Sequence, residues 1–256
     1  MSDRGADGTA RGAGASAAVP APDHPRTVLF WDIDGTLLST ARAGVFALED
    51  AAEALLGRRP DYSTLETAGL TDHAIAALAL EREGGDASEE AVHAFIAIYE
   101  RRLPERLPLR QGTVMPRVKD VLEALDGRPD VLSLLLTGNT RAGATAKLGH
   151  YGLAGHFAEG AEGLDGAFSR DLGSRDSIAR RAHDLAAERL GRMPSPERAY
   201  VIGDTPHDIG AGNAIGARTV AVATGGYELG ALEAHDPWWA VKVLPEPSAF
   251  VERLGL

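Results

Sequence analysis

Continuous runs of apolar residues alternate along much of the chain with stretches in which apolar side chains recur every three or four positions. The apolar runs predict buried strands over 27–31, 131–136, 200–202, 219–222 and 239–243. The helical spacing predicts helices over 117–125, 140–151, 177–190, 208–215 and 247–254. Regular alternation of strand and helix is typical of an α/β fold, so we expect a doubly wound, mostly parallel sheet.

The stretch from about residue 40 to residue 109 carries helical spacing without any strand pattern. Helices are expected over 43–56, 71–83 and 88–103, and Pro104 is expected to end the last of them. We therefore predict that residues 40–112 form a helical cap domain with its own small core. Residues 26–39 and 113–256 would then form the α/β core into which it is inserted.

Composition narrows the function classes. The chain has 256 residues, a formal net charge of −11 and no cysteine. Disulfides, thiolate zinc sites and cysteine nucleophiles are thereby excluded, and the negative charge disfavours nucleic acid and anionic membranes as partners. Lysine is rare in this arginine-rich chain, being present only at Lys119, Lys147 and Lys242.

The first 25 residues are mostly Gly, Ala, Ser, Asp and Pro. Such a segment buries too little apolar surface to offset the entropy of ordering, so we expect a disordered tail. The sequence shows neither the apolar core of a signal peptide nor a run long enough to span a membrane. A cytoplasmic location is the expectation that follows.

Two carboxylates follow the first apolar run, in the sequence Asp32-Ile33-Asp34-Gly35-Thr36. Gly35 allows a sharp turn, so both side chains can face one small site at the carboxyl end of a strand, where open α/β sheets bind ligands. A plain Asp-Gly turn is the structural alternative, which the full motif after five apolar residues disfavours.

Two more strands are expected to end in polar loops at the same edge. Thr137-Gly138-Asn139 offers hydrogen-bond donors suited to an anionic oxygen, although Thr and Asn also favour helix starts. Asp204 and Asp208 are four residues apart, so a helix that begins there can present both carboxylates on one side, although Asp208 can also simply cap that helix. Carboxylates crowded at one edge require a cation, and oxygen ligands favour Mg²⁺ over Zn²⁺.

These three segments resemble motifs one, two and four of the haloacid dehalogenase (HAD) superfamily, phosphoglycolate phosphatase-like subfamily, over roughly residues 26–254. The insertion resembles the helical C1-type cap of that family. The resemblance implies a Mg²⁺-dependent phosphatase of a small phosphorylated metabolite. It makes Asp32 the nucleophile and Asp34 the general acid and base. Mg²⁺ would be held by Asp32, Asp34, Asp204 and Asp208, and phosphate by Thr137, Gly138, Asn139 and a basic residue.

The basic residue of the third motif is not marked by a Lys-Pro pair. Arg175, which follows Gly166-Ala167-Phe168 at a short distance, is the preferred candidate, and Lys147, Arg170 and Arg180 stay as alternatives. By the same resemblance Thr71 and Asp72 lie in a cap loop that faces the substrate. Thr71 fits equally well as the N-cap of the helix that follows it.

Several other functions can be weighed against the phosphatase. A phosphomutase shares both Asp32 and Asp34 and is the nearest alternative, and a non-catalytic binding protein on the same fold is a further one. Dehalogenases of the superfamily lack the second carboxylate. A phosphonatase needs a cap lysine, and residues 40–112 contain none.

Overall fold

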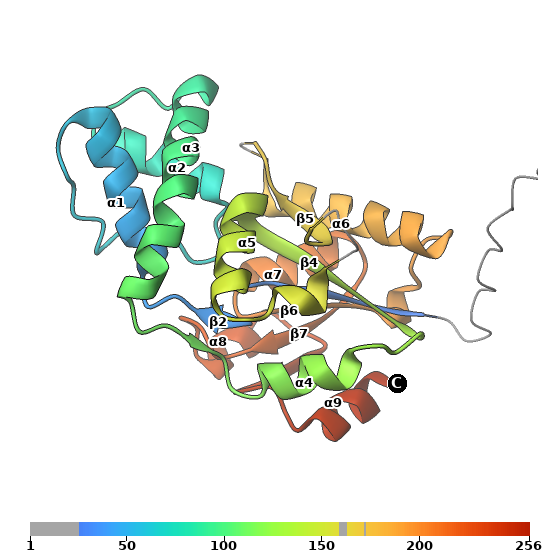
Figure 1. Ribbon diagram of the computed structural model, residues 1–256. Coiled ribbons are helices and arrows are strands. Elements are labelled where there is room, and N and C mark those ends of the chain that lie inside the picture. Colours follow the sequence, from blue (N-terminus) through green and yellow to red (C-terminus); the bar gives the residue numbers. More distant parts are fainter. Residues whose placement is uncertain (1–25, 159–162, 172) are drawn as a thin grey trace, which may run out of the picture.

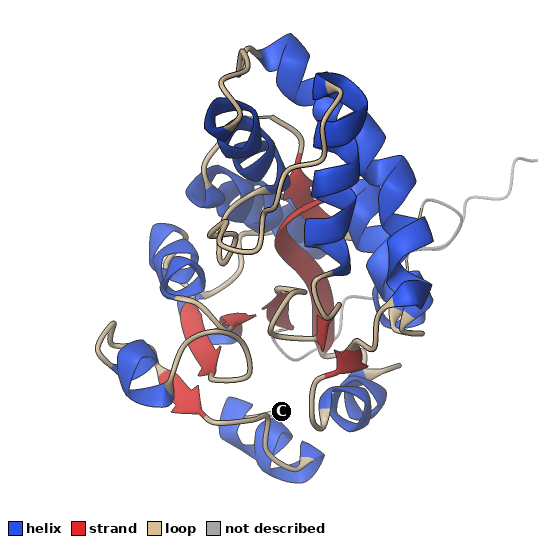
Figure 2. Ribbon diagram, turned by 90° about the vertical axis from the view of Figure 1, so that its left-hand side faces the viewer, coloured by secondary structure: helices blue, strands red, loops and turns tan. Residues whose placement is uncertain are grey.

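The computed structural model describes residues 26–158, 163–171 and 173–256, so the disordered tail expected at 1–25 lies outside the described residues. Within these ranges, six strands form a sheet in the order β5-β4-β1-β6-β7-β8 (Figure 1), and every neighbouring pair is parallel. Helices lie on both faces of this sheet (Figure 2). The predicted doubly wound α/β fold is confirmed. The strands are β1 (Thr27–Trp31), β4 (Val131–Thr140), β5 (Gly166–Ser169), β6 (Ala199–Gly203), β7 (Arg218–Val222) and β8 (Trp239–Val241).

The helices of the described ranges follow the expected order along the chain, apart from α8, which was not expected. They are α1 (Ala43–Leu56), α2 (Asp72–Arg82), α3 (Glu89–Arg106), α4 (Val118–Leu125), α5 (Arg141–His150), α6 (Arg175–Leu190), α7 (Pro206–Ala214), α8 (Leu229–Glu233) and α9 (Pro247–Leu254). Short 3-10 turns lie at Leu107–Leu109, Ala154–Phe157 and Pro196–Arg198.

Strand β1 shows why the central strands appear as continuous apolar runs. Leu29 and Trp31 pack on one face of the sheet, in a core shared with α4, α5 and α9. Val28 and Phe30 pack on the other face, in a core shared with α6 and α7. Because successive side chains of a strand point to opposite faces, a strand covered on both sides must be apolar throughout.

Helices α1, α2 and α3 bury their apolar sides mainly against one another. Their shared core includes Ala47, Ile75, Phe95 and Tyr99, all buried. The chain enters and leaves this region through a small antiparallel ladder between β2 (Leu38–Ser39) and β3 (Thr113–Val114). We call residues 43–109 the three-helix insert. The two crossings between insert and sheet therefore lie side by side.

The polar segment after the second apolar run is strand, not loop. Strand β4 continues to Thr140, and its pairing with β5 shifts register between Leu136 and Thr140. Strand β5 was not expected, because Gly166–Ser169 is short and has no flanking pattern of its own. Its pairing with β4 extends β4 past the apolar residues and carries Thr137 and Asn139 in extended conformation.

Several helix ends differ from the sequence expectation by one to three residues, among them those of α3 and α6. Helix α3 passes through Pro104 and ends at Arg106, two residues later, so the proline lies within the last turn and the helix stops soon after it, as a residue without an N–H favours. Helix α6 begins at Arg175, where the side chain of Ser174 accepts a hydrogen bond from the Ser177 N–H. Arg175 is therefore the first residue of the helix instead of preceding it.

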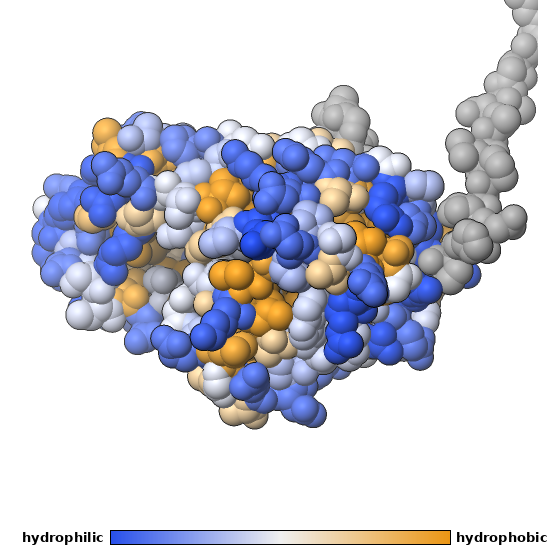
Figure 3. All heavy atoms as spheres, turned by 90° about the horizontal axis from the view of Figure 1, so that it is seen from below, coloured by the Kyte–Doolittle hydropathy of each residue, from blue (hydrophilic) through white to orange (hydrophobic). Residues whose placement is uncertain are grey.

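Hydrophobic positions on the face seen from below, over α4 and α9, lie in separate groups among hydrophilic ones (Figure 3). Within the described ranges, no helix has both the length and the apolar character needed to cross a bilayer.

Candidate active site

Asp32 and Asp34 lie at the carboxyl end of β1, between the ends of β4 and β6. The Asp32 N–H donates to the Ile202 carbonyl (3.0 Å), so β1 and β6 stay paired up to the first carboxylate. Ile33 is fully buried between the two carboxylates. Gly35 then takes a positive φ of 82°, which only glycine adopts readily, and turns the chain at the site.

A cluster of three buried carboxylates forms at this edge. Oxygens of Asp32, Asp204 and Asp208 all lie within 4.8 Å of one another. Asp204 follows β6 and accepts a hydrogen bond from Thr36 Oγ1 (3.0 Å). A Cβ on Gly35 or on Gly225 would lie 2.3 Å or 1.7 Å from Asp204 Oδ2, so both backbones pack directly against this carboxyl.

The cluster is electrostatically unfavourable without a cation. Burial raises the pKa of Asp32 from 3.8 to about 6; Arg175 opposes this rise, and Asp208 adds to it. Burial, followed by repulsion from Asp208 and Asp32, raises the pKa of Asp204 from 3.8 to about 8. A donor set made of carboxylate oxygens suits a hard divalent cation. The residues present therefore fit Mg²⁺.

Asp208 is used in two ways at once. As the third residue of α7 it forms a capping box with Thr205, whose N–H and Oγ1 donate to Asp208 Oδ2 (3.0 and 2.8 Å). Its Oδ1 pairs with the Arg175 guanidinium. Asp208 therefore caps α7, as the alternative interpretation of the sequence expected, and also belongs to the acidic cluster.

Arg175 lies within the cluster. Its Nη2 is 2.9 Å from Asp32 Oδ1, and the side chain is buried. Its Nε is a buried donor with no hydrogen-bond partner in the described ranges. A Cβ on Gly138 would lie 3.1 Å from Arg175 Nη1, so the missing side chain of Gly138 leaves room for the guanidinium. An unpaired buried N–H beside the Asp32 carboxyl is suited to an anionic oxygen.

Asn139 and Lys147 approach Asp34 from the other side. Asn139 Nδ2 donates to Thr137 Oγ1 and to Asp34 Oδ2, both at 2.8 Å. Lys147 Nζ, reaching from α5, lies 2.5 Å from both Asp34 Oδ2 and Asn139 Oδ1. The site therefore contains two buried cations, Arg175 beside Asp32 and Lys147 beside Asp34.

Thr71 and Asp72 are engaged within the protein. Thr71 Oγ1 accepts from the Ala74 N–H (3.2 Å) and caps α2, as the alternative interpretation expected. Asp72 Oδ2 accepts from the Thr140 N–H (2.8 Å) at the start of α5. Thr71 thus caps α2, whereas Asp72 also lines the cavity over the carboxylates, so its contact with a substrate stays a prediction.

The remaining candidates for the basic residue, Arg170 and Arg180, form no hydrogen bond or ion pair with Asp34 or with the acidic cluster in the described residues. Arg170 is exposed and 3.5 Å from Asp171, and Arg180 is exposed on α6. Sequence reasoning missed the contact between Lys147 and Asp34 and the packing of Thr36 and Gly225 on Asp204. A lone lysine on the helix that follows Thr137-Gly138-Asn139, in a chain that otherwise uses arginine, is the signal that was available.

A cavity of about 300 Å³ opens over the carboxylates between the sheet edge and the three-helix insert. Its walls include Asp32, Asp34, Asn139, Lys147, Arg175 and Asp204 from the core, and Arg42, Val45, Leu48, Leu70 and Tyr99 from the insert and its connections. The cavity is therefore lined by charged and polar side chains on the core side and mostly by apolar side chains on the side of the insert.

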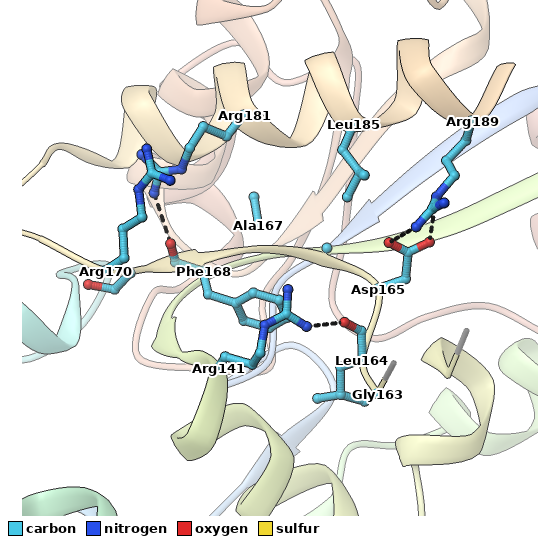
Figure 4. A pocket seen from close by; sticks show the side chains of 12 residues that line it. Arg141, Gly163, Leu164, Asp165, Ala167, Phe168, Arg170, Arg181, Leu185 and Arg189 are labelled. Carbon is cyan, nitrogen blue, oxygen red and sulfur yellow. Dashed lines mark hydrogen bonds and ion pairs between the residues drawn. The ribbon is translucent and has the colours of Figure 1, made fainter. Parts of the chain in front are cut away.

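A second cavity, of about 400 Å³, lies at the free edge of β5 (Figure 4). Arg141 donates to the Leu164 carbonyl and lies over the Phe168 ring, 4.3 Å from its centroid. Arg181 donates to the Phe168 carbonyl (2.8 Å). These side chains occupy backbone acceptors at the strand edge, and none of the carboxylates of the acidic cluster lines this cavity.

Comparison with known proteins gives a family match over most of the chain. A family model described as haloacid dehalogenase-like hydrolase matches residues 29–212, and one described as HAD-hydrolase-like matches residues 178–247. Tyrosine-protein kinase PtkA of Mycobacterium tuberculosis is 32% identical over 206 residues, covering 79% of this chain and 64% of that protein. The chain thus spans less than two thirds of the length of this relative.

Solved structures share the fold. A "predicted phosphatase" from Clostridium acetobutylicum has a TM-score of 0.65 at 17% identity, covering 91% of this chain and 100% of that one. A "predicted phosphoglycolate phosphatase" from Haemophilus somnus has a TM-score of 0.65 at 18% identity, covering 85% and 94%. At these identities the likeness concerns the fold alone.

Proposed function

The chain belongs to the haloacid dehalogenase-like hydrolase family; from this premise we propose that it is a hydrolase, and specifically a Mg²⁺-dependent phosphatase of a small phosphomonoester. One observation carries the proposal. Asp32, a buried carboxylate of the acidic cluster that fits a cation, also contacts a guanidinium that keeps an unpaired donor. A second carboxylate, Asp34, opens on the same cavity.

In the first proposed step Asp32 attacks phosphorus. An oxygen of Asp32 forms a new bond to phosphorus as the bond from phosphorus to the ester oxygen breaks. The departing alkoxide takes a proton from the Asp34 carboxyl, which leaves an aspartyl phosphate and a neutral alcohol. Asp34 is suited to this role because its side chain is 44% exposed, whereas Asp32 is buried.

In the second proposed step water attacks phosphorus of the aspartyl phosphate. Asp34, now a carboxylate, takes the proton of that water as the bond from phosphorus to Asp32 breaks. Inorganic phosphate leaves and both carboxylates return to their initial states. A phosphomutase would instead pass the phosphoryl group to a second hydroxyl of the substrate, so release of inorganic phosphate distinguishes the two.

The other groups of the site hold charge in place. When bound, Mg²⁺ supplies positive charge that keeps Asp32 ionised and lets it approach an anionic phosphate; Asp32, Asp204 and Asp208, with the Asp34 carbonyl, would hold it. Arg175 would bind phosphate oxygens through its free Nε–H. Gly138 and Asn139 line the same cavity, and together with Thr137 they would hold the other phosphate oxygens, since positioning and electrostatics dominate phosphoryl transfer.

The metal requirement gives a direct test. Purified protein should release phosphate from an aryl phosphate with Mg²⁺ and lose that activity with a chelator. Full activity after chelation would contradict the metal part of the proposal.

Stability should report the same cation without catalysis. The pKa values of Asp32 and Asp204 are raised from the ordinary 3.8 to about 6 and about 8. Each carboxyl therefore binds its proton more tightly in the folded protein than in the unfolded chain. Without metal, the stability they contribute is present below about pH 4 and is lost as pH rises through 6 and 8. The Mg²⁺-induced rise in melting temperature should therefore be larger at pH 8.5 than at pH 5. An equal shift at both values would count against binding at these carboxylates.

We further propose that the three-helix insert is a cap domain that moves on the core. Ser39 and Thr113 pair in the two-stranded ladder, and Ala41 and Arg42 beside it have positive φ values of 46° and 69°. Both crossings thus lie together, as a hinge requires. Closure would exclude water from the cavity over the carboxylates.

Spin labels can test this motion because the chain has no native cysteine. Cysteines introduced at exposed positions Leu55 on α1 and Arg180 on α6 give one distance between insert and core. A phosphate analogue with Mg²⁺ should narrow and shift the distance distribution. A label pair within the core, at Arg180 and Lys119, should not change. Identical distributions for the first pair with and without the analogue would reject cap movement.

A further inference from the structure

Lys147 is a buried cation that the proposed reaction has not yet used. It is 4% exposed, whereas Lys119 and Lys242 are exposed. An ammonium is costly to bury unless its donors are paired. Here Nζ has two acceptors at 2.5 Å, Asp34 Oδ2 and Asn139 Oδ1. The side chain is thus held by the candidate acid and by a residue of the second motif.

These contacts occupy one oxygen of Asp34 and leave the other. Oδ2 of Asp34 receives Lys147 Nζ and Asn139 Nδ2 (2.8 Å), which approach from the β4 and α5 side. No hydrogen bond to Asp34 Oδ1 is formed within the described part of the chain. Because the side chain is 44% exposed, packing alone does not fix its rotamer. The two donors on Oδ2, Lys147 Nζ and Asn139 Nδ2, fix that rotamer.

We propose that Lys147 is a positioning residue that fixes Asp34 through Oδ2, so that Oδ1 exchanges the proton with the leaving group and with water. The inference rests on the proposed function. It divides the two cations of the site: Arg175 serves the nucleophile and the phosphoryl group, and Lys147 serves the acid and base. A misdirected Asp34 slows leaving-group departure most where that departure needs a proton.

The first test compares two leaving groups. Lys147→Met keeps the length of the side chain and removes the charge. We expect kcat/KM to fall about 100-fold for an alkyl phosphate, whose alkoxide needs protonation, and less than about fivefold for p-nitrophenyl phosphate, whose leaving group does not. Lys119→Met, the same change on the exposed face of α4, should leave both rates unchanged. Equal losses on the two esters would overturn the inference.

The absence of native cysteine allows the ammonium to be restored chemically. Lys147→Cys can be aminoethylated in denaturant and refolded, which regenerates a side chain of lysine's length with a terminal ammonium. We expect this treatment to recover most of the alkyl phosphatase rate, and capping the same thiol with a neutral group to recover none. Circular dichroism of the two modified proteins would show whether both refold. If the aminoethylated and neutral forms are equally active, Lys147 does not position Asp34.

A double-mutant comparison separates this role from general destabilisation. In an Asp34→Asn background the acid is already lost, so adding Lys147→Met should reduce the alkyl phosphatase rate by less than about threefold. A further 100-fold loss there would assign Lys147 to something other than Asp34. Failure of the phosphatase proposal itself is distinguishable, because the unmodified protein would then release no phosphate from either ester.

Discussion

Replacing Asp32 with asparagine is expected to abolish phosphate release, with a loss of at least about 10⁴-fold in kcat, because an amide cannot form the aspartyl phosphate. The remaining groups cannot compensate for this loss. Asp34, two residues further along the chain, cannot take the place of Asp32 because its Oδ2 is held by Lys147 and Asn139. Asp204 is likewise held, by a hydrogen bond from Thr36. Phosphate release under saturating substrate is the measurement.

The fold of the Asp32→Asn protein should persist. Asparagine has the shape of aspartate and can still accept from Arg175, and burial already makes the Asp32 charge unfavourable, as its raised pKa of about 6 shows. The melting temperature should therefore stay within a few degrees of the unmodified protein. Asp176→Asn, an exposed change on α6, provides the matched control. A variant that keeps even a tenth of the rate would show that Asp32 is not the nucleophile.

The central sheet and the acidic cluster were accessible from sequence because strand and functional residue are contiguous. The run Thr27–Trp31 fixes where β1 ends, and Asp32 follows it without a gap. The same holds for Asp204 after β6. In a parallel sheet the carboxyl ends share one edge, so the convergence of these residues required no knowledge of side-chain packing.

The contacts of Lys147 and Asp72 could not be predicted in the same way. Lys147 meets Asp34 only because α5 packs on the sheet with Lys147 on its inward side. The apolar positions of α5 are too few to predict which side of the helix faces the sheet. Asp72 accepts from the Thr140 N–H because the three-helix insert lies against α5. Both contacts depend on how two elements dock, which local spacing does not encode.

The placement of Arg175 was predicted from a resemblance, and its contacts give the role physical content. The guanidinium touches Asp32 and Asp208 through Nη2 and keeps a buried Nε–H without a partner in the described ranges. A residue that served only to neutralise the cluster would have no use for a spare buried donor. We therefore expect the phosphoryl oxygens to complete its hydrogen bonds.

Arg175→Ala should then reduce kcat/KM by about 30- to 1000-fold, equivalent to about 2–4 kcal/mol, the range for removing a preorganised donor. Arg175→Lys should recover only part of this, because an ammonium keeps the charge and loses the planar fork. Arg180→Ala, an exposed change on the same helix, should have no effect. A loss below threefold for Arg175→Ala would contradict the assignment.

The pH dependence of the Arg175→Ala protein should change in a defined direction. Arg175 opposes the burial that raises the pKa of Asp32 to about 6, so its removal raises that pKa further. Asp32 must be ionised to attack phosphorus, and the acid limb of kcat/KM against pH should therefore move to higher pH. Saturating Mg²⁺ should reduce the displacement, because the bound cation also favours the ionised carboxylate. A displacement to lower pH would mean that Arg175 and Asp32 do not interact in the working enzyme.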